Sequence, residues 1–100
     1  MLISYKDKTV IITGAARGIG KNIATKFSEA GATVVIVDIN AKDGKSAVDE
    51  ICSSGYKAEY FKLDLSDIKK IEEMMTSLFN KYKNIDVLVN NARAGEKTKP

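Results

Sequence analysis

Residues 13–20 have the sequence Thr-Gly-Ala-Ala-Arg-Gly-Ile-Gly, and this stretch decides the fold. It directly follows a β-branched apolar run at residues 9–12 and directly precedes a segment with apolar residues at helical spacing. A glycine-rich turn between a strand and a helix is the setting of a phosphate-binding loop. Gly14 permits a tight turn, and Gly18 lets the backbone approach a pyrophosphate closely. Gly20 allows the helix to pack closely on the sheet.

The spacing of these glycines narrows the class of phosphate binder. The sequence is G-x-x-x-G-x-G, whose first gap is wider than in the common dinucleotide fingerprint G-x-G-x-x-G. The N-terminus of the following helix would present N–H groups and the positive end of its dipole to the phosphates. Gly20 is followed by Lys21-Asn22, so the Gly-Lys-Ser/Thr of nucleotide triphosphatases is absent. The alternative is that the glycines serve only a turn.

On both sides of this loop, short apolar runs alternate with longer amphipathic segments. Continuous runs at residues 9–12, 33–37 and 87–89 are typical of strands buried on both faces of a parallel sheet. The more mixed segment at residues 58–63 is typical of an edge strand. We therefore expect four strands, joined by helices in the order β-α-β-α-β-α-β.

Capping signals place the three helices. Gly31 is expected to end the first helix, and Asn40 to cap the second, which Gly55 follows. Ser66 and Asp67 are expected to open the third. In the first helix, helical spacing is kept by Ile19, Ile23, Ala24 and Phe27. Residues expected to face inward are Ala47, Val48 and Ile51 in the second helix and the apolar stripe Ile68, Ile71, Met75, Leu78, Phe79 and Tyr82 in the third, with Met74 also assigned to the core.

This order predicts an α/β fold: a Rossmann-type, doubly wound parallel sheet in a three-layer α/β/α arrangement, with strand order 3-2-1-4. Residues 1–100 would form the N-terminal part of a single NAD(P)-binding domain. Residues 87–89 have the composition of an interior strand but would lie at an open edge, which favours a chain that is part of a longer protein. Residues 93–100 are polar and without periodicity, as in a loop.

Composition excludes several kinds of site. The chain is 44% hydrophobic and 29% charged, and its net charge of +3 is not concentrated in a basic block, so nucleic acid and anionic membranes are not indicated as partners. Histidine is absent and Cys52 is the single cysteine, which excludes an internal disulfide, a His/Cys metal site and a Ser-His-Asp triad. Apolar stretches are too short to span a bilayer. We expect a cytoplasmic domain without a metal.

Asp38 stands at the end of the second predicted strand, about 20 residues beyond the glycine loop. A carboxylate there can accept both hydrogen bonds of an adenosine ribose diol and would repel a 2′-phosphate, which favours NAD over NADP. Arg17 in the loop could instead hold a 2′-phosphate, which keeps NADP as the alternative. An ordinary strand-end acid is the structural alternative for Asp38.

Together these features resemble the classical branch of the short-chain dehydrogenase/reductase family. Thr13-Gly14-x-x-x-Gly18-x-Gly20 is similar to its glycine motif, and Asp64-Leu65 to the acidic pair that holds the adenine. Asn90-Asn91-Ala92 is similar to the start of its Asn-Asn-Ala-Gly motif. The resemblance extends over nearly all of the chain but covers only the cofactor-binding half of the family's pattern.

The resemblance assigns roles to particular residues. Gly14, Gly18, Ile19 and Gly20 would line the pyrophosphate, with Arg17 beside them. Asp38 would bind the adenosine ribose, and Ile39 would pack near the adenine. Asp64 would accept a hydrogen bond from the adenine amine, and the Leu65 backbone would complete the contacts along that edge of the adenine. Asn90 and Ala92 would lie beside the ribose. For Asn90 and Asn91 a purely structural role in satisfying loop backbone groups is an equal alternative.

Two departures from the family pattern concern the cofactor pose near the nicotinamide ribose and the catalytic residues. Arg93 stands where the family has glycine, and Gly95 is the nearest glycine that could restore the backbone freedom. The family's catalytic serine and Tyr-x-x-x-Lys pair lie downstream of the Asn-Asn-Ala segment and have no counterpart here. No tyrosine in the chain has a lysine four residues later. No catalytic residue is assigned, and the chain alone is expected to be inactive.

For the intact protein the resemblance implies an oxidoreductase that transfers hydride between a nicotinamide and a small alcohol or carbonyl substrate, and a homo-oligomer of two or four subunits. The alternative is a dinucleotide-binding regulatory module without catalysis.

Overall fold

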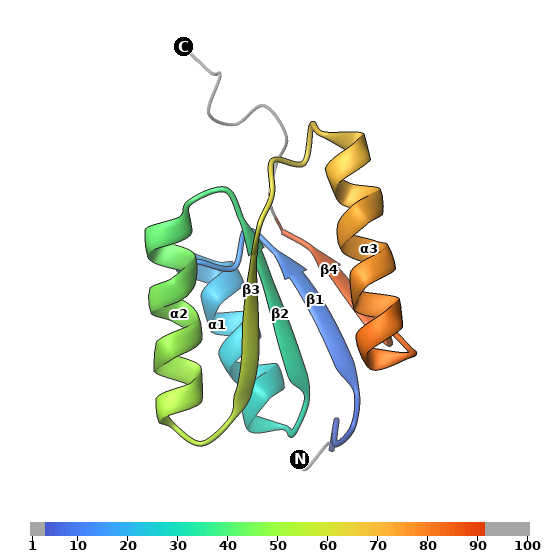
Figure 1. Cartoon of the computed structure of the whole chain (residues 1–100). Helices are drawn as coiled ribbons and strands as arrows, with labels where there is room; N and C mark the ends of the chain where they lie inside the picture. Colours follow the sequence, from blue (N-terminus) through green and yellow to red (C-terminus); the bar gives the residue numbers. More distant parts are fainter. Residues whose placement is uncertain (1–3, 92–100) are drawn as a thin grey trace.

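The computed structural model describes residues 4–91 and has three layers: a four-stranded parallel sheet with two helices on one face and one on the other (Figure 1). The strand order is β3-β2-β1-β4, as predicted. The elements are β1 (Thr9–Thr13), α1 (Gly18–Glu29), β2 (Thr33–Asp38), α2 (Ala41–Ser53), β3 (Lys57–Lys62), α3 (Ile68–Tyr82) and β4 (Val87–Asn90).

The two central strands are apolar throughout because both of their faces are covered. All five residues of β1 are buried, and β2 places Val35 beside Ile11 in the parallel register. Alternate side chains enter different cores: Val10 and Ile12 pack with α1 and α2, while Ile11 packs with α3. This double burial explains why the sequence shows continuous apolar runs there instead of alternation.

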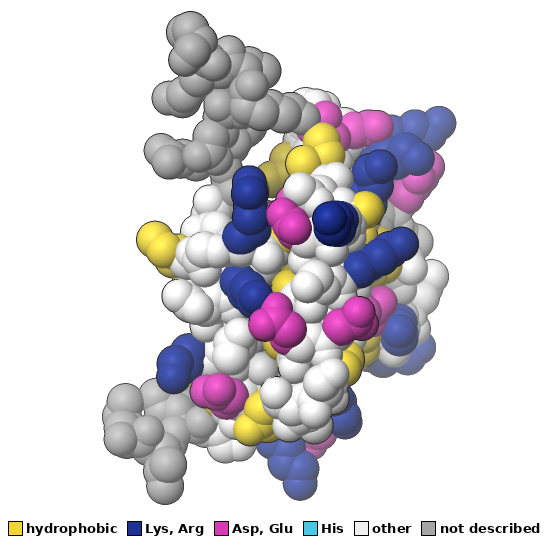
Figure 2. All heavy atoms as spheres, turned by 90° about the vertical axis from the view of Figure 1, so that its left-hand side faces the viewer, with side chains coloured by type: hydrophobic (Ala, Val, Ile, Leu, Met, Phe, Trp, Pro, Cys, Tyr) yellow, Lys and Arg dark blue, Asp and Glu magenta, His cyan; other side chains and the backbone are white. Residues whose placement is uncertain are grey.

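Helices α1 and α2 bury small residues against the sheet and expose charge. Asn40 caps α2 by accepting a hydrogen bond from the Asp43 N–H at 3.0 Å, as its position predicted. Gly31 follows α1 with φ of +103°, a conformation that favours glycine. Figure 2 shows basic and acidic side chains interspersed over the α2 side of the molecule. One cross-helix ion pair on this surface joins Lys21 to Glu50.

Part of the predicted inward stripe of α3 is wrong. Ile68 is 72% exposed and Phe79 is 49% exposed, whereas Met74 and Leu78 enter the core. The first turn of α3, which begins at Ile68, extends past the ends of the strands (Figure 1). Phe79 follows Leu78, and one residue rotates a helical side chain by about 100°, which turns Phe79 away from the sheet.

Strand β4 lies at the edge of the sheet formed by residues 4–91. Its Leu88 is 62% exposed, while Val87 and Val89 pack against the α1–α2 core. Asp86 anchors the start of β4 to β1: its carboxylate accepts from the Thr9 N–H at 2.8 Å, and its own N–H donates to the Thr9 carbonyl at 2.9 Å. Of the helices in the described range, none combines the length and apolarity needed to cross a membrane.

Candidate functional site

The carboxyl ends of all four strands lie at one edge of the sheet (Figure 1). In a doubly wound sheet this edge is the place where ligands bind. The glycine loop follows β1, Asp38 ends β2, Asp64 follows β3 and Asn90 ends β4. Residues far apart in the sequence are thereby brought to one end of the molecule.

The glycine loop needs two of its glycines for backbone conformation. Gly14 has φ of +66° and Gly18 has φ of +63°, a region that other residues adopt at a cost of roughly 1–2 kcal/mol. The Gly14 N–H donates to the Val37 carbonyl at 2.8 Å, which joins the loop to β2. A Cβ on Gly18 would have nothing within 4 Å. The loop is therefore open at Gly18, where a ligand can approach the backbone.

Gly20 is needed because there is no room for a side chain at this position. A Cβ on Gly20 would lie 2.6 Å from Asn91 Nδ2 and 3.0 Å from Ala15 Cα, and closer still to the Gly14 carbonyl oxygen. Gly20 was expected to allow close packing of the helix on the sheet, but the groups that a Cβ would meet belong to the glycine loop and to the residue after β4. This glycine allows α1 to start directly beside the loop.

The N-terminus of α1 differs from those of α2 and α3. Asn40 caps α2, and Asp67 caps α3 through a 3.1 Å hydrogen bond from the Lys70 N–H. Within the described chain the N-cap residue of α1, Arg17, contributes no side-chain cap. The first N–H groups of a helix lack partners inside the helix. The start of α1 thus fits an anionic ligand such as a pyrophosphate.

The Asp38 carboxylate is fixed by two backbone donors. Its Oδ2 accepts from the Ala16 N–H at 3.2 Å, and its Oδ1 accepts from the Asn40 N–H at 2.9 Å. One donor belongs to the glycine loop and the other to the residue that caps α2. The half-buried side chain therefore bridges the two segments and is oriented before any ligand binds.

Tyr60 is a residue that the sequence analysis missed. Its hydroxyl donates a 2.7 Å hydrogen bond to the main-chain carbonyl of Asp38. The sequence did carry a signal, because Gly44 lies in the interior of the α2 helix, where glycine is unfavourable without a packing reason. That reason is the ring of Tyr60.

Arg17 points along the surface toward α2. Its side chain is 80% exposed, and its Nε lies 3.7 Å from Asp43 Oδ2. An exposed pair at this distance contributes at most about 1 kcal/mol to stability. The guanidinium is therefore free to be drawn to another anion near the start of α2.

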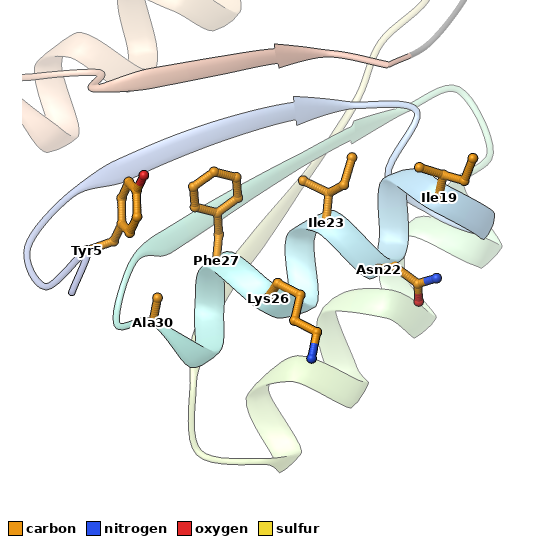
Figure 3. A pocket seen from close by; sticks show the side chains of 7 residues that line it. All are labelled: Tyr5, Ile19, Asn22, Ile23, Lys26, Phe27 and Ala30. Carbon is orange, nitrogen blue, oxygen red and sulfur yellow. The ribbon is translucent and has the colours of Figure 1, made fainter. Parts of the chain in front are cut away.

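The two predicted isoleucines are both exposed on the surface. Ile39 is 44% exposed beside Asp38, and Ile19 is 73% exposed in the first turn of α1. Ile19 also borders a hollow of about 380 Å³ along α1, together with Ile23, Phe27 and Tyr5 (Figure 3). The rings of Tyr5 and Phe27 meet edge to face at a centroid distance of 5.0 Å. This hollow runs along the helix and does not include Asp38 or Asp64.

Asp64 takes part in the turn that opens α3. Its Oδ1 accepts from the Ser66 N–H at 2.9 Å and from the Ser66 hydroxyl at 2.8 Å, and its carbonyl accepts from the Asp67 N–H. Leu65 packs against the α3-side core. Asp64 thus has a structural role that the sequence analysis did not foresee. The predicted contact with an adenine amine stays a prediction.

A hydrogen-bond network links the ends of β1 and β4. The Thr13 hydroxyl donates to Asn90 Oδ1 at 3.2 Å and accepts from the Asn91 N–H at 3.0 Å. The Asn91 side chain donates to the Gly14 carbonyl at 3.1 Å. Both asparagines therefore have structural partners, and a ligand role for Asn90 stays a prediction. Ala92, Arg93 and Gly95 lie outside the described residues.

Comparison with known proteins agrees with this geometry. The short chain dehydrogenase family model matches residues 8–100. The 7alpha-hydroxysteroid dehydrogenase of Escherichia coli (strain K12) is 42% identical over 88 residues, which are 88% of this chain and 34% of that protein. The chain thus spans about a third of the length of this curated relative.

Solved structures show the same likeness. The crystal structure of a hydroxysteroid dehydrogenase from Escherichia coli superposes with a TM-score of 0.85 at 40% identity, over 92% of this chain and 39% of that one. A metagenomic short-chain oxidoreductase in complex with NADP gives a TM-score of 0.86 at 33% identity, over 95% of this chain and 45% of that one.

Proposed function

The chain belongs to the short-chain dehydrogenase family, and we propose that it forms the cofactor-binding part of an NAD-dependent oxidoreductase. In the whole protein, a bound nicotinamide would supply hydride transfer to or from an alcohol or carbonyl carbon. The residues of this chain bind and orient the dinucleotide. The proposal is supported by the site at the carboxyl ends of the strands and by the family.

The observation that carries the preference for NAD is the fixed carboxylate of Asp38. The N–H groups of Ala16 and Asn40 orient it at the end of β2. In this position each oxygen keeps a lone pair for one hydroxyl of an adenosine ribose diol. A 2′-phosphate at the same place would bring a second negative charge against the carboxylate, which disfavours NADP.

The remaining contacts follow from the same placement. The uncapped start of α1, with the open backbone at Gly18, would hold the pyrophosphate between Gly14 and Gly20. The family resemblance would place Ile39, Asp64 and Leu65 around the adenine. It would also place Asn90 and Ala92 beside the ribose next to the nicotinamide.

Calorimetric titration of the purified protein with NAD and NADP tests the proposal. We expect NAD to bind at least about tenfold more tightly, which corresponds to about 1.4 kcal/mol. Asp38→Ala should remove most of this preference, whereas Asp49→Asn, which removes an exposed acid of α2, should keep it. Equal affinities in the unmodified protein would refute the preference, and no binding of either dinucleotide would refute the function.

NADP is the second candidate, and Arg17 is the observation that favours it. The guanidinium is exposed and held only by a 3.7 Å contact with Asp43, so it can turn toward a 2′-phosphate. The solved relative in complex with NADP shows that a chain of similar fold accepts this cofactor. If NADP binds more tightly and Arg17→Ala abolishes that advantage, this second candidate holds.

Properties of the whole protein extend the proposal. We infer a small-molecule alcohol or carbonyl substrate, a cytoplasmic location and a homo-oligomer of two or four subunits, all supported by the family. Light scattering of the purified protein measures the subunit number, and a monomer would contradict the last inference. A screen of hydroxysteroids and simpler secondary alcohols, with NAD reduction as readout, tests the substrate class.

A further inference from the structure

We propose that Tyr60 is a positioning residue that sets the orientation of Asp38 and thereby contributes to cofactor choice. This inference rests on the proposed role of Asp38 in binding the adenosine ribose. It assigns to β3, the edge strand beside α2, a function in a site formed by the loops after β1 and β2 (Figure 1).

The position of Tyr60 follows from the register of the sheet. Tyr60 pairs with Ile36, two residues before Asp38, in the parallel β2–β3 register. Its side chain leaves β3 on the α1–α2 face, together with that of Ala58. From there the long side chain leans toward the carboxyl end of β2, and its hydroxyl lies 2.7 Å from the Asp38 carbonyl oxygen.

Gly44 provides the space that the ring of Tyr60 occupies beside α2. A Cβ on Gly44 would lie 2.5 Å from Tyr60 Cδ1 and 2.8 Å from Tyr60 Cζ, so any larger residue would displace the ring. Gly44 is fully inside α2 and buried, where glycine costs about 1 kcal/mol relative to alanine. The ring of Tyr60 thus lies directly against Gly44 of α2, and from this position its hydroxyl reaches the Asp38 carbonyl.

The hydrogen bond from Tyr60 holds the main chain of Asp38, the residue whose carboxylate is proposed to bind the ribose. The Asp38 carbonyl accepts from the Tyr60 hydroxyl at 2.7 Å and from the Leu63 N–H at 3.3 Å. The carboxylate of the same residue accepts from Ala16 and Asn40. Asp38 is therefore held at both its main chain and its side chain, and the shorter main-chain contact is that with Tyr60.

The charge state of Tyr60 is compatible with this donor role. Burial raises the pKa of the Tyr60 hydroxyl above its usual value of 10, and the negative charge of Asp38 raises it further. The hydroxyl consequently stays protonated at neutral pH and can donate.

The test compares Tyr60→Phe with Tyr56→Phe, which deletes the hydroxyl of an exposed tyrosine nearby in the sequence. Phenylalanine keeps the ring over Gly44, so the fold should be retained. We expect Tyr60→Phe to weaken NAD binding roughly three- to tenfold, to leave NADP binding nearly unchanged, and so to lower the NAD/NADP affinity ratio. Tyr56→Phe should bind both dinucleotides as the unmodified protein does.

A double-mutant cycle separates positioning from mere stabilisation. With Asp38→Ala already present, Tyr60→Phe should no longer change NAD affinity, because it acts through the carboxylate. A Tyr60→Phe variant that loses thermal stability but keeps its NAD/NADP ratio would overturn the inference and leave the proposed function intact. If Asp38→Ala itself leaves that ratio unchanged, the role of Asp38 fails, and the role of Tyr60 fails with it.

Discussion

The side-chain amide of Asn91 donates a 3.1 Å hydrogen bond to the main-chain carbonyl of Gly14, across 77 residues of sequence. The bond joins the residue after β4 to the glycine loop after β1, and these strands are neighbours in the sheet. The amide nitrogen also occupies the space that a Cβ on Gly20 would need. The geometry of the loop therefore depends on a contact from the edge strand.

Gly20→Ala is expected to destabilise the protein through this crowding. Alanine is favoured over glycine in a helix by about 1 kcal/mol, but overpacking here should outweigh that gain and leave a net loss of about 1–2 kcal/mol. Urea denaturation measures the loss. Asn91→Ala should recover part of it, because one of the crowded atoms is removed. Gly18→Ala offers a matched comparison, since its cost comes from φ of +63° and Asn91→Ala should not relieve it.

Thr13→Val is expected to loosen the junction of β1 and β4. Valine keeps the shape but leaves the Asn91 N–H without the Thr13 oxygen and Asn90 Oδ1 without the hydroxyl donor. The loss of these partly buried hydrogen bonds should reduce the free energy of unfolding by about 1–3 kcal/mol. Thr13→Ser keeps the hydroxyl and should lose clearly less. Equal losses in the two variants would show that the methyl group matters and the network does not.

Asp86→Ala is expected to fray the start of β4. The carboxylate of Asp86 accepts the Thr9 N–H at 2.8 Å, and alanine removes this acceptor. We expect a loss of about 1 kcal/mol in chemical denaturation, with faster hydrogen exchange of the Thr9 amide. Asp86→Asn retains an acceptor oxygen and should exchange more slowly than the alanine variant. Identical exchange rates would contradict this anchor.

Stability should fall in alkaline solution, in part through Tyr82. Burial raises the pKa of Tyr82, and the hydrogen bond that Tyr82 donates to Glu59 raises it further. Because the folded-state pKa lies above the unfolded value of 10, this contribution is fully present below pH 10 and is lost as the pH rises through the folded pKa.

The hydrogen bond of Lys81 to the same Glu59 carboxylate raises the pKa of Lys81, so the stability that Lys81 contributes is also lost at alkaline pH, beginning near pH 10.5.

Because Tyr82→Phe removes the titrating hydroxyl, this variant should lose less stability between pH 9 and pH 11 than the unmodified protein, as followed by thermal melts. A Tyr82→Phe curve that runs parallel to that of the unmodified protein over this range would contradict the coupling.

The order of elements and the position of the loop followed from local sequence. The β-branched run before Gly14 and the helical spacing after Gly20 define strand, turn and helix with no distant information. The start of α2 was likewise predictable from Asn40, because a capping side chain accepts a hydrogen bond from an N–H group only a few residues away. The parallel strand order was predictable because right-handed crossovers leave few arrangements.

The tertiary structure alone decided which partners a side chain meets on other elements of the fold. The exposure of Ile68 depends on where the sheet ends beneath α3, and the bond from Tyr60 to Asp38 depends on the β2–β3 register and on Gly44. Periodicity reports which side of an element is apolar, but not how far its neighbour extends or which atoms face it. The sequence by itself determined a Rossmann-type fold with a glycine-rich loop after β1 and an acid at the end of β2. The tertiary structure decided how that acid is held, because the N–H groups of Ala16 and Asn40 meet its carboxylate and the Tyr60 hydroxyl meets its carbonyl.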